Sequence, residues 1–247
     1  MFFFSTDYLL WVLLPTILLT GWAAWRVRST YGRWSKVDSG IGLNAFDFAR
    51  RLLDRQGLTD VRIEPTPGQL TDHYDPRGKV LRVSQAVASG QIGRSDDPAR
   101  GAPSVPSGNL SVAAAAVIAH EVGHALQDHQ RDPWMQVRSV IVPAAQIGSN
   151  LGPWLVVGGL IFQIEGLALA GLLAFGAAVI FTLVTLPVEI GASGKALAFV
   201  DGLGMVGDWQ DGARAVLKAA AWTYVAAALT AILTFLYYAF LVFGRRD

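Results

Sequence analysis

The chain has 247 residues, of which 52% are hydrophobic and 16% are charged, and its formal net charge is +1. A charge this close to zero argues against a nucleic-acid partner, and the lack of cysteine excludes disulfides, thiolate metal sites and cysteine-protease chemistry. The positive mean hydropathy is too high for an ordinary soluble enzyme, so we expect the lipid bilayer to be a partner.

The first apolar run, Tyr8–Trp25, has no charge and the length of one membrane span. We therefore predict an N-terminal transmembrane anchor over residues 1–28. A cleaved secretory signal has basic residues before its apolar core, whereas here they follow it, at Arg26, Arg28 and Arg33. Because loops rich in Lys and Arg stay in the cytoplasm, the segment after this span is predicted to be cytoplasmic.

Residues 29–110 are predicted to form a small soluble α+β module. Asn44 is a suitable N-cap for an amphipathic helix, because its side chain can accept a hydrogen bond from the first turn. Alternating apolar residues predict short strands at 61–64 and 80–83, and residues 72–79 resemble a strand end followed by a turn.

A stretch rich in Gly, Pro, Ser and Asp occupies residues 90–108, and it has no apolar period. Such a composition predicts a flexible loop. Its place directly before the next apolar run is compatible with a disordered insertion or with a gate over a neighbouring site.

The alanine-rich run Val112–Leu126 contains an H-E-x-x-H motif formed by His120, Glu121 and His124, and we predict a metal-binding helix over residues 111–138. On a helix the two histidines lie one turn apart on one face, where both can bind one Zn²⁺ ion. Glu121 is then placed as the general base of a peptidase. A coincidental pattern is the alternative, but two of only four histidines fall at ligand spacing.

A much longer apolar region, Leu151–Ile190, exceeds the length of a single span and is interrupted near its middle by Gln163 and Glu165. This pattern predicts two transmembrane helices joined by a tight turn, that is, a helical hairpin over residues 139–190.

The last apolar run, Ala219–Phe243, predicts a C-terminal transmembrane helix within residues 219–247. The intervening residues 191–218 are predicted to be a cytoplasmic segment. The expected fold class is therefore mainly α: an integral membrane protein with about four transmembrane helices and a small α+β cytoplasmic module.

A catalytic zinc site normally has three protein ligands, so a third must join the two histidines. Glu189 ends a hydrophobic span, where a carboxylate is costly unless it is paired, protonated or bound to a metal. It is a candidate ligand, although it could also lie at the water boundary and pair with Lys195. His73 is another candidate, as a ligand or a donor, whereas His129 lies more than one turn beyond His124.

The chain resembles the neutral zinc metallopeptidases of bacterial membranes, the YugP-like family. The resemblance rests on the H-E-x-x-H helix together with further segments spread over most of the chain. These segments are Gly57–Arg62, Leu70–Pro76, Ala119–Gln127, Arg138 and Ser139 with Pro143, Leu186–Glu189 with Ala192 and Ser193, and Ala219–Leu229.

The resemblance implies a membrane-embedded, zincin-like peptidase that cleaves peptide or protein substrates and uses Zn²⁺ as its cofactor. It implies the two-histidine, one-glutamate arrangement of gluzincins in a bacterial inner membrane. The basic residues after the first span predict that the active site is on the cytoplasmic side. The implied metal ligands are His120, His124 and Glu189, and the implied catalytic base is Glu121.

Three further residues are candidates for supporting this site from its surroundings. His73 and Asp75 belong to a segment that is similar to the family's, although a residue before proline in a turn, as Asp75 is, is structural in the simplest interpretation. Tyr224 lies in an apolar helix, where it either packs or donates a hydrogen bond near the site.

The chain departs from the family pattern at two places. Gly191 stands two residues after the implied glutamate ligand, where the family usually has an acidic residue, and Gly194 and Lys195 stand where it tends to have two basic residues. An acidic residue there would orient a metal-binding histidine, and losing such a partner costs roughly 10–100-fold in affinity or activity. The alternative function is therefore a membrane scaffold or adaptor that keeps the fold without turnover.

Overall fold

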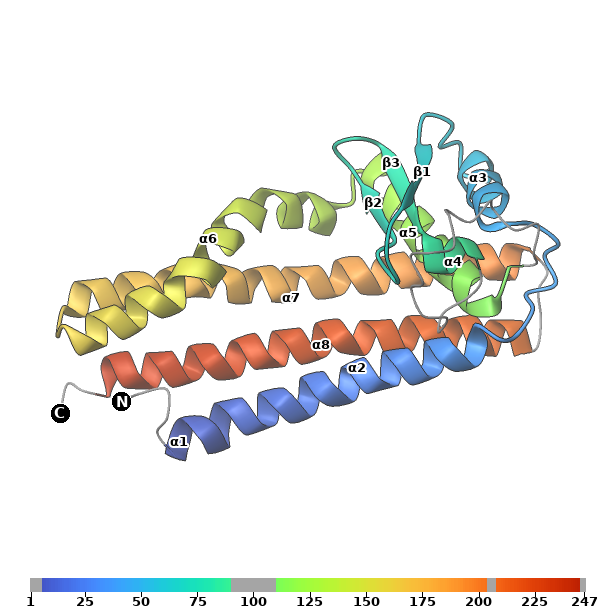
Figure 1. Ribbon diagram of the computed structural model, residues 1–247. Coiled ribbons are helices and arrows are strands. Elements are labelled where there is room, and N and C mark those ends of the chain that lie inside the picture. The colour runs from blue at the N-terminus through green and yellow to red at the C-terminus, as the bar shows by residue number, and fades with distance from the viewer. Residues whose placement is uncertain (1–5, 90–109, 204–207, 245–247) are drawn as a thin grey trace. The chain divides into compact units, whose positions relative to one another are not determined.

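The structure is a computed structural model that describes residues 6–89, 110–203 and 208–244, so the predicted loop at 90–108 lies outside the described residues. Helices dominate this part of the chain (Figure 1). In order, the elements are α1 (Thr6–Tyr8), the π-helix η2 (Leu9–Leu13), α2 (Leu14–Trp34), α3 (Ala45–Arg55), β1 (Arg62–Thr66), β2 (His73–Asp75), β3 (Val80–Ser84), α4 (Gln85–Ser89), α5 (Val112–His129), α6 (Pro133–Ile161), α7 (Glu165–Gly202) and α8 (Asp208–Phe243).

The chain divides into two compact units, and each has its own internal packing. The helical unit contains the apolar helices, and the α+β unit contains the sheet and α5. The helical unit comprises Met1–Trp25, Pro133–Glu189 and Ala221–Asp247, and the α+β unit comprises Arg26–Asp132 and Ile190–Ala220. The predicted fold class, a mainly α membrane protein with a small α+β module, is confirmed.

Among the described residues, four helical stretches are long and apolar enough to cross a membrane, as the sequence predicts. They are Thr6–Trp34, Pro133–Ile161, Glu165–Gly202 and Trp209–Phe243. Large apolar side chains on them point outward, for example Trp11, which is 71% exposed, because a bilayer and not the protein interior would cover them.

Helices α6 and α7 form the predicted hairpin, joined by a short turn at Gln163, whose φ of 58° is left-handed (Figure 1). Small residues let the two backbones touch. A Cβ atom on Gly148 would collide with the backbone of Ala174, and one on Gly171 would lie 2.5 Å from the backbone nitrogen of Val156. Close approach of this kind is the usual way in which membrane helices associate.

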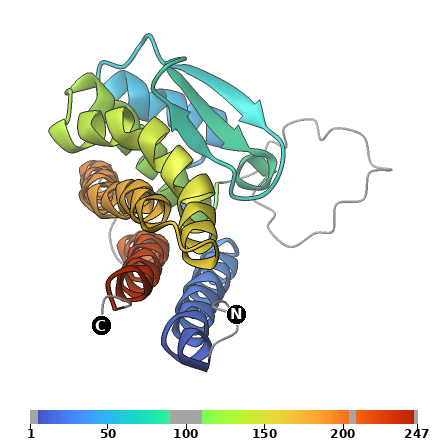
Figure 2. The same cartoon turned by 90° about the vertical axis from the view of Figure 1, so that its left-hand side faces the viewer.

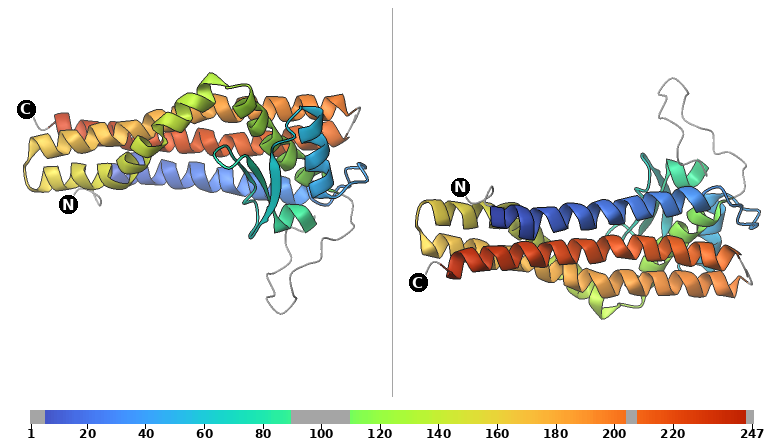
Figure 3. Two further views of the ribbon diagram at one scale, coloured as in Figure 1. Left: turned by 90° about the horizontal axis from the view of Figure 1, so that it is seen from above. Right: turned by 90° about the horizontal axis from the view of Figure 1, so that it is seen from below.

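Helices α2 and α8 run antiparallel to one another in the helical unit (Figure 3). The rings of Tyr8 and Tyr237 lie 5.1 Å apart near one end, and those of Trp22 and Trp222 lie 5.3 Å apart near the other. The first and last spans of the chain are therefore neighbours.

The α+β unit has a three-stranded sheet in the order β1-β3-β2, in which β3 pairs with β1 in parallel and with β2 in antiparallel orientation (Figure 2). The central strand is buried along most of its length. The antiparallel register sets Tyr74 opposite Leu81, and both side chains are buried. Strand β2 is thus an edge strand whose middle residue faces the interior of the unit.

Helix α3 begins where the sequence predicts, because the Asn44 side chain accepts a hydrogen bond from the backbone N–H of Asp47 at 2.9 Å. Its apolar face, with Phe48 and Leu52 fully buried, packs against α5. Helix α5 also packs against β2 and β3, so it forms the centre of this unit.

Helix α5 is capped by Ser111, whose hydroxyl accepts from the backbone N–H of Ala114 at 3.2 Å. All six of its alanines, including the four at 113–116, are fully buried. Side chains this small let neighbouring elements approach α5 closely from several sides, which places its polar residues inside the unit.

Candidate metal centre

Helix α5 presents the residues of the H-E-x-x-H motif on one face, as the helical period requires. The imidazole rings of His120 and His124 have their centroids 4.7 Å apart and stand nearly perpendicular, at 84°. His124 is buried, whereas His120 and Glu121 are half-buried. A helix is therefore present at these residues, and it ends at His129, before the predicted end at residue 138.

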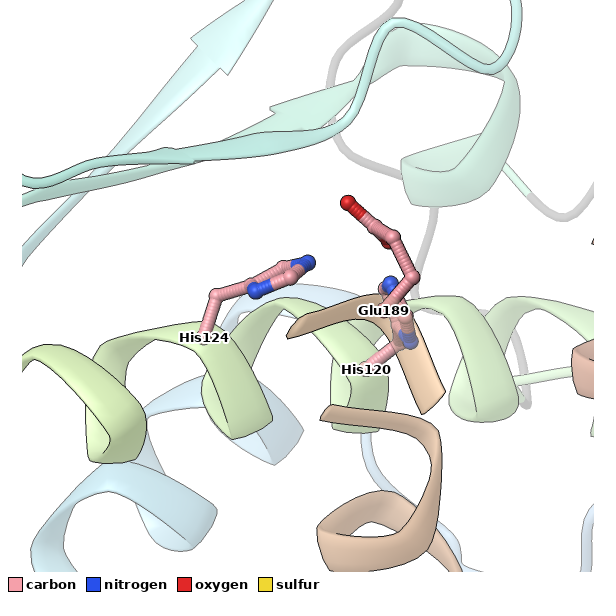
Figure 4. Close-up of side chains that lie close together, drawn as sticks. All are labelled: His120, His124 and Glu189. Carbon is pink, nitrogen blue, oxygen red and sulfur yellow. The ribbon is translucent and has the colours of Figure 1, made fainter. Parts of the chain in front are cut away.

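Glu189 joins the two histidines from α7 (Figure 4). One ligand atom from each of the three residues lies within 4.8 Å of the others, and Glu189 is only 3% exposed. Glu189 is the last residue of its segment in the helical unit, and α7 continues unbroken into Ile190 of the α+β unit. The structure thus brings together the three residues that the sequence nominates as ligands.

The contact that lets α7 reach α5 is made by Gly123 and Ala192. A Cβ atom on Gly123 would lie 2.6 Å from the backbone oxygen of Ala192, closer than real Cβ atoms come. The glycine inside the H-E-x-x-H motif therefore admits the neighbouring backbone, and this close contact helps to determine the distance between the two helices.

Each histidine ring has one nitrogen engaged by a neighbouring side chain. Nδ1 of His124 is 2.9 Å from Oε1 of Gln127, and Nδ1 of His120 is 3.2 Å from the hydroxyl oxygen of Ser193. Sequence reasoning assigned neither partner a role. The signal was their spacing, since Gln127 lies one turn after His124 and Ser193 one turn after Glu189.

Tyr74 on strand β2 contacts α5 at two points, and sequence reasoning missed it. Its backbone N–H donates to Oε2 of Glu121 at 2.9 Å, and its hydroxyl donates to Oδ2 of Asp128 at 2.8 Å. The ammonium group of Lys79 also pairs with Asp128. Burial, together with the hydrogen bond to Asp128, raises the pKa of Tyr74 above its usual range, so its hydroxyl stays a neutral donor.

His73 and Asp75, the predicted supporting residues, flank Tyr74 and point to the other face of β2. Nδ1 of His73 lies 2.8 Å from the backbone oxygen of Thr71, and Nε2 lies 3.2 Å from the Arg82 guanidinium. Asp75 accepts from the backbone N–H groups of Arg77 and Gly78, and the bond from Gly78 contributes most to lowering the pKa of Asp75. Both residues therefore organise the turn before β3.

Tyr224, the third supporting candidate, is half-buried on α8 and belongs to the helical unit. His129 is exposed at the end of α5.

Lys195, which the sequence offers as a partner for Glu189, donates to Oε1 of Gln130 at 2.6 Å. The cation beside Glu189 is Arg138 of α6, whose Nη1 is 3.7 Å from Oε1 of Glu189.

Comparison with known proteins identifies a family and a relative of this chain. The family model described as "Putative neutral zinc metallopeptidase" matches residues 9–92 and 104–243. The "Putative membrane protease YugP" of Bacillus subtilis (strain 168) is 37% identical over 230 residues, which cover 93% of this chain and 94% of that protein. No solved structure matches the chain. The matched region includes every residue of the candidate centre, and the chain therefore belongs to the family of neutral zinc metallopeptidases.

Proposed function

We propose that the protein is a membrane-embedded zinc metallopeptidase that hydrolyses peptide bonds in proteins or peptides. The observation that carries the proposal is the cluster of His120, His124 and Glu189, with Glu121 in the adjacent position on α5. Two imidazoles and one carboxylate are a ligand set that zinc uses in peptidases, and they leave a coordination position open.

The residues present fit a zinc ion. Ligands at about 2.0–2.2 Å from a tetrahedral zinc lie about 3.3–3.6 Å from one another. The 4.8 Å limit within which the three ligand atoms lie is somewhat wider, so side-chain adjustments would close the set around the ion. The contacts of Nδ1 in His120 and His124 favour Nε2 of each ring as the ligand atom.

Bound zinc supplies Lewis acidity at the peptide carbonyl and at the attacking water. In this proposal Glu121 takes the proton of that water and later delivers it to the leaving amine. The hydrogen bond from the Tyr74 backbone N–H holds the Glu121 carboxylate in one rotamer. In this proposal His73 and Asp75 support the site through the turn that they organise, and Tyr224 on α8 stays a candidate supporting residue.

The alternative function, a scaffold without turnover, rests on the missing acidic residue at Gly191. That residue was expected to orient a metal-binding histidine. In this chain the ring of His124 has Gln127 as a partner and the ring of His120 has Ser193. Neither ring therefore needs an acidic residue at position 191 for its orientation. The peptidase is therefore the function that the site supports best.

The test compares bound metal and proteolysis in detergent-purified full-length protein. We expect about one zinc per wild-type chain, much less in Glu189→Ala, and full zinc without proteolysis in Glu121→Gln. A wild-type protein that stays metal-free after zinc loading would overturn the peptidase and favour the scaffold. Equal zinc in the wild type and Glu189→Ala would remove Glu189 as a ligand.

We also propose that the protein lies in a bacterial inner membrane with the centre on the cytoplasmic side. The chain has no cysteine, so single cysteines can be introduced without removing native ones. His129 at the end of α5 and Gln163 in the hairpin turn are both exposed, so each is replaced by cysteine in a separate variant. In intact cells, a membrane-impermeant maleimide should label position 163 and not position 129; the reverse pattern would invert the orientation.

A further inference from the structure

We infer that Gln127 positions His124 for the metal, and that in this chain Gly191 leaves room for this placement of the Gln127 side chain. This inference rests on the proposed function, since it concerns the zinc site. It assigns a purpose to the position at which this chain departs from its family. The departure is then not expected to impair zinc binding, because Gly191 and Gln127 fit one another.

A metal-binding histidine needs an acceptor for its second ring nitrogen. When one nitrogen binds the metal, the other carries a proton, and an acceptor for that proton fixes the tautomer and the ring orientation. His124 is buried, so water is a poor substitute for such an acceptor. The carbonyl oxygen of Gln127, 2.9 Å from Nδ1 of His124, meets this need.

Among the polar residues that the structure describes, Gln127 is one of the two that are 0% exposed, with Ser84, and it has the larger side chain. Burying an amide without partners is costly, and side chains such as Gln are seldom fully buried without a partner. It follows His124 by three residues on α5, so the helix itself brings the two side chains together. Both properties indicate a residue held in place for a specific contact.

Gly191 faces the far end of the Gln127 side chain. A Cβ atom at position 191 would lie 2.8 Å from Nε2 of Gln127, with that nitrogen as its nearest neighbour. A flexible amide could normally move away at little cost. Here the movement would withdraw Oε1 from His124, because both atoms belong to the same planar group. Any side chain at 191 therefore competes with the bond between Gln127 and His124.

Gly194 provides a matched control on the same helix. It is exposed on α7, and a Cβ atom there would meet no atom within 4 Å. Replacing either glycine by alanine raises helix propensity by a similar amount. Only the replacement at 191 should disturb Gln127, so a difference between the two variants isolates the contact.

The experiment measures the zinc dissociation constant of full-length protein in detergent, by competition with a chromophoric chelator. Gln127→Met keeps the length of the side chain and removes the acceptor, and we expect roughly 10–100-fold weaker zinc binding. Gln127→Glu restores an acceptor oxygen and should bind zinc within a few-fold of the wild type. Of the two Gln127 variants, only Gln127→Met should change the visible spectrum of the cobalt-substituted protein.

Gly191→Ala should weaken zinc binding in the same direction as Gln127→Met, and Gly194→Ala should leave it unchanged. If both variants act through one bond, adding Gly191→Ala to Gln127→Met should weaken binding no further. Gly191→Ala is a small change, so it gives an answer even if Gln127→Met fails to fold.

The outcomes separate this inference from the proposed function. Wild-type protein that binds no zinc overturns the proposed function itself. Two outcomes overturn the inference and leave the proposed peptidase function intact. In one, Gln127→Met binds zinc as tightly as the wild type does. In the other, Gly191→Ala and Gly194→Ala bind zinc with equal affinity. Weaker binding by Gln127→Met and Gly191→Ala, with recovery in Gln127→Glu, supports both.

Discussion

The backbone N–H of Tyr74 donates a hydrogen bond to Oε2 of Glu121, so an edge strand of the sheet holds the proposed catalytic base directly. The Tyr74 side chain reaches further along α5 and donates to Asp128. One residue therefore fixes β2 to the helix at two points, two turns apart.

Removing the Tyr74 hydroxyl should loosen the strand without deleting the bond to Glu121. We expect Tyr74→Phe to lower the free energy of unfolding by about 1–3 kcal/mol, because a hydrogen bond to a charged acceptor is lost. The measurement is the thermal midpoint in detergent. An Asp128→Asn variant is the control, since it keeps an acceptor for Tyr74 and loses only the charge that pairs with Lys79; an unchanged midpoint in Tyr74→Phe would contradict the prediction.

The close contact between Gly123 and Ala192 should tolerate no side chain. Gly123→Ala places a methyl group against a backbone oxygen at 2.6 Å, so α5 and α7 must separate. Overpacking of this kind costs about 1–3 kcal/mol, and the separation should also weaken zinc binding. The check is thermal stability with and without zinc, compared with Gly194→Ala; stability equal to that control would count against a backbone contact.

Arg138 should matter most when no metal is bound. Its guanidinium lies 3.7 Å from Glu189, which is nearly buried, and it balances the carboxylate charge there. Arg138→Met should destabilise metal-free protein by roughly 1–2 kcal/mol, less than for a fully buried pair because Arg138 is partly exposed. Zinc replaces the missing positive charge, so the zinc-induced rise in midpoint should be larger in Arg138→Met than in the wild type. Equal rises in both proteins would show that Arg138 does not neutralise Glu189.

The turn before β3 should depend on pH through Asp75. Hydrogen bonds from the Gly78 and Arg77 backbones, with Arg82 nearby, lower the pKa of Asp75 below its usual 3.8. A lowered native pKa stabilises the folded state above the unfolded pKa and loses that contribution as pH falls through the native value. Asp75→Asn should therefore melt at a lower temperature than the wild type at pH 6, and the gap should shrink below about pH 4. A gap that is constant between pH 6 and pH 3 would mean that the charge is irrelevant.

The parts of the fold that follow from local pattern were predictable. Uninterrupted apolar runs predicted the spans, and Asn44 predicted the start of α3, because both signals lie within a few residues of what they determine. The extension of α6 back to Pro133 was less accessible. Pro143 and Pro153 interrupt its apolar pattern, yet the helix passes through both.

The candidate metal centre was predictable where its residues share one element. His120, Glu121 and His124 follow from helical spacing alone. Glu189 is brought to them by the packing of α7 on α5, and residue arguments left its role open until the family resemblance was considered. Helical spacing also places Gln127 near His124, but a glutamine at that position can have many roles. Only its burial and its 2.9 Å distance to His124 identify it as a partner of that histidine.

Strand β2 shows why neighbours in sequence are poor guides to a site. His73 and Asp75 were candidates because their segment is similar to the family's, with a structural turn as the simplest interpretation of Asp75. Alternate residues of a strand point to opposite faces, so Tyr74 between them faces α5 instead. Its most important group for the site is a backbone N–H, which every residue except proline carries and no composition reveals.

The order in which the ligands occur along the chain has a consequence for biosynthesis. A ribosome that has finished α5 has made both histidines and the glutamate of the motif, but the third proposed ligand follows only after all of α6 and the first part of α7. Both of those stretches belong to helices long and apolar enough to cross a membrane. Under the proposed function, the nascent protein would therefore have neither a complete metal centre nor proteolytic activity until most of its membrane hairpin has been made.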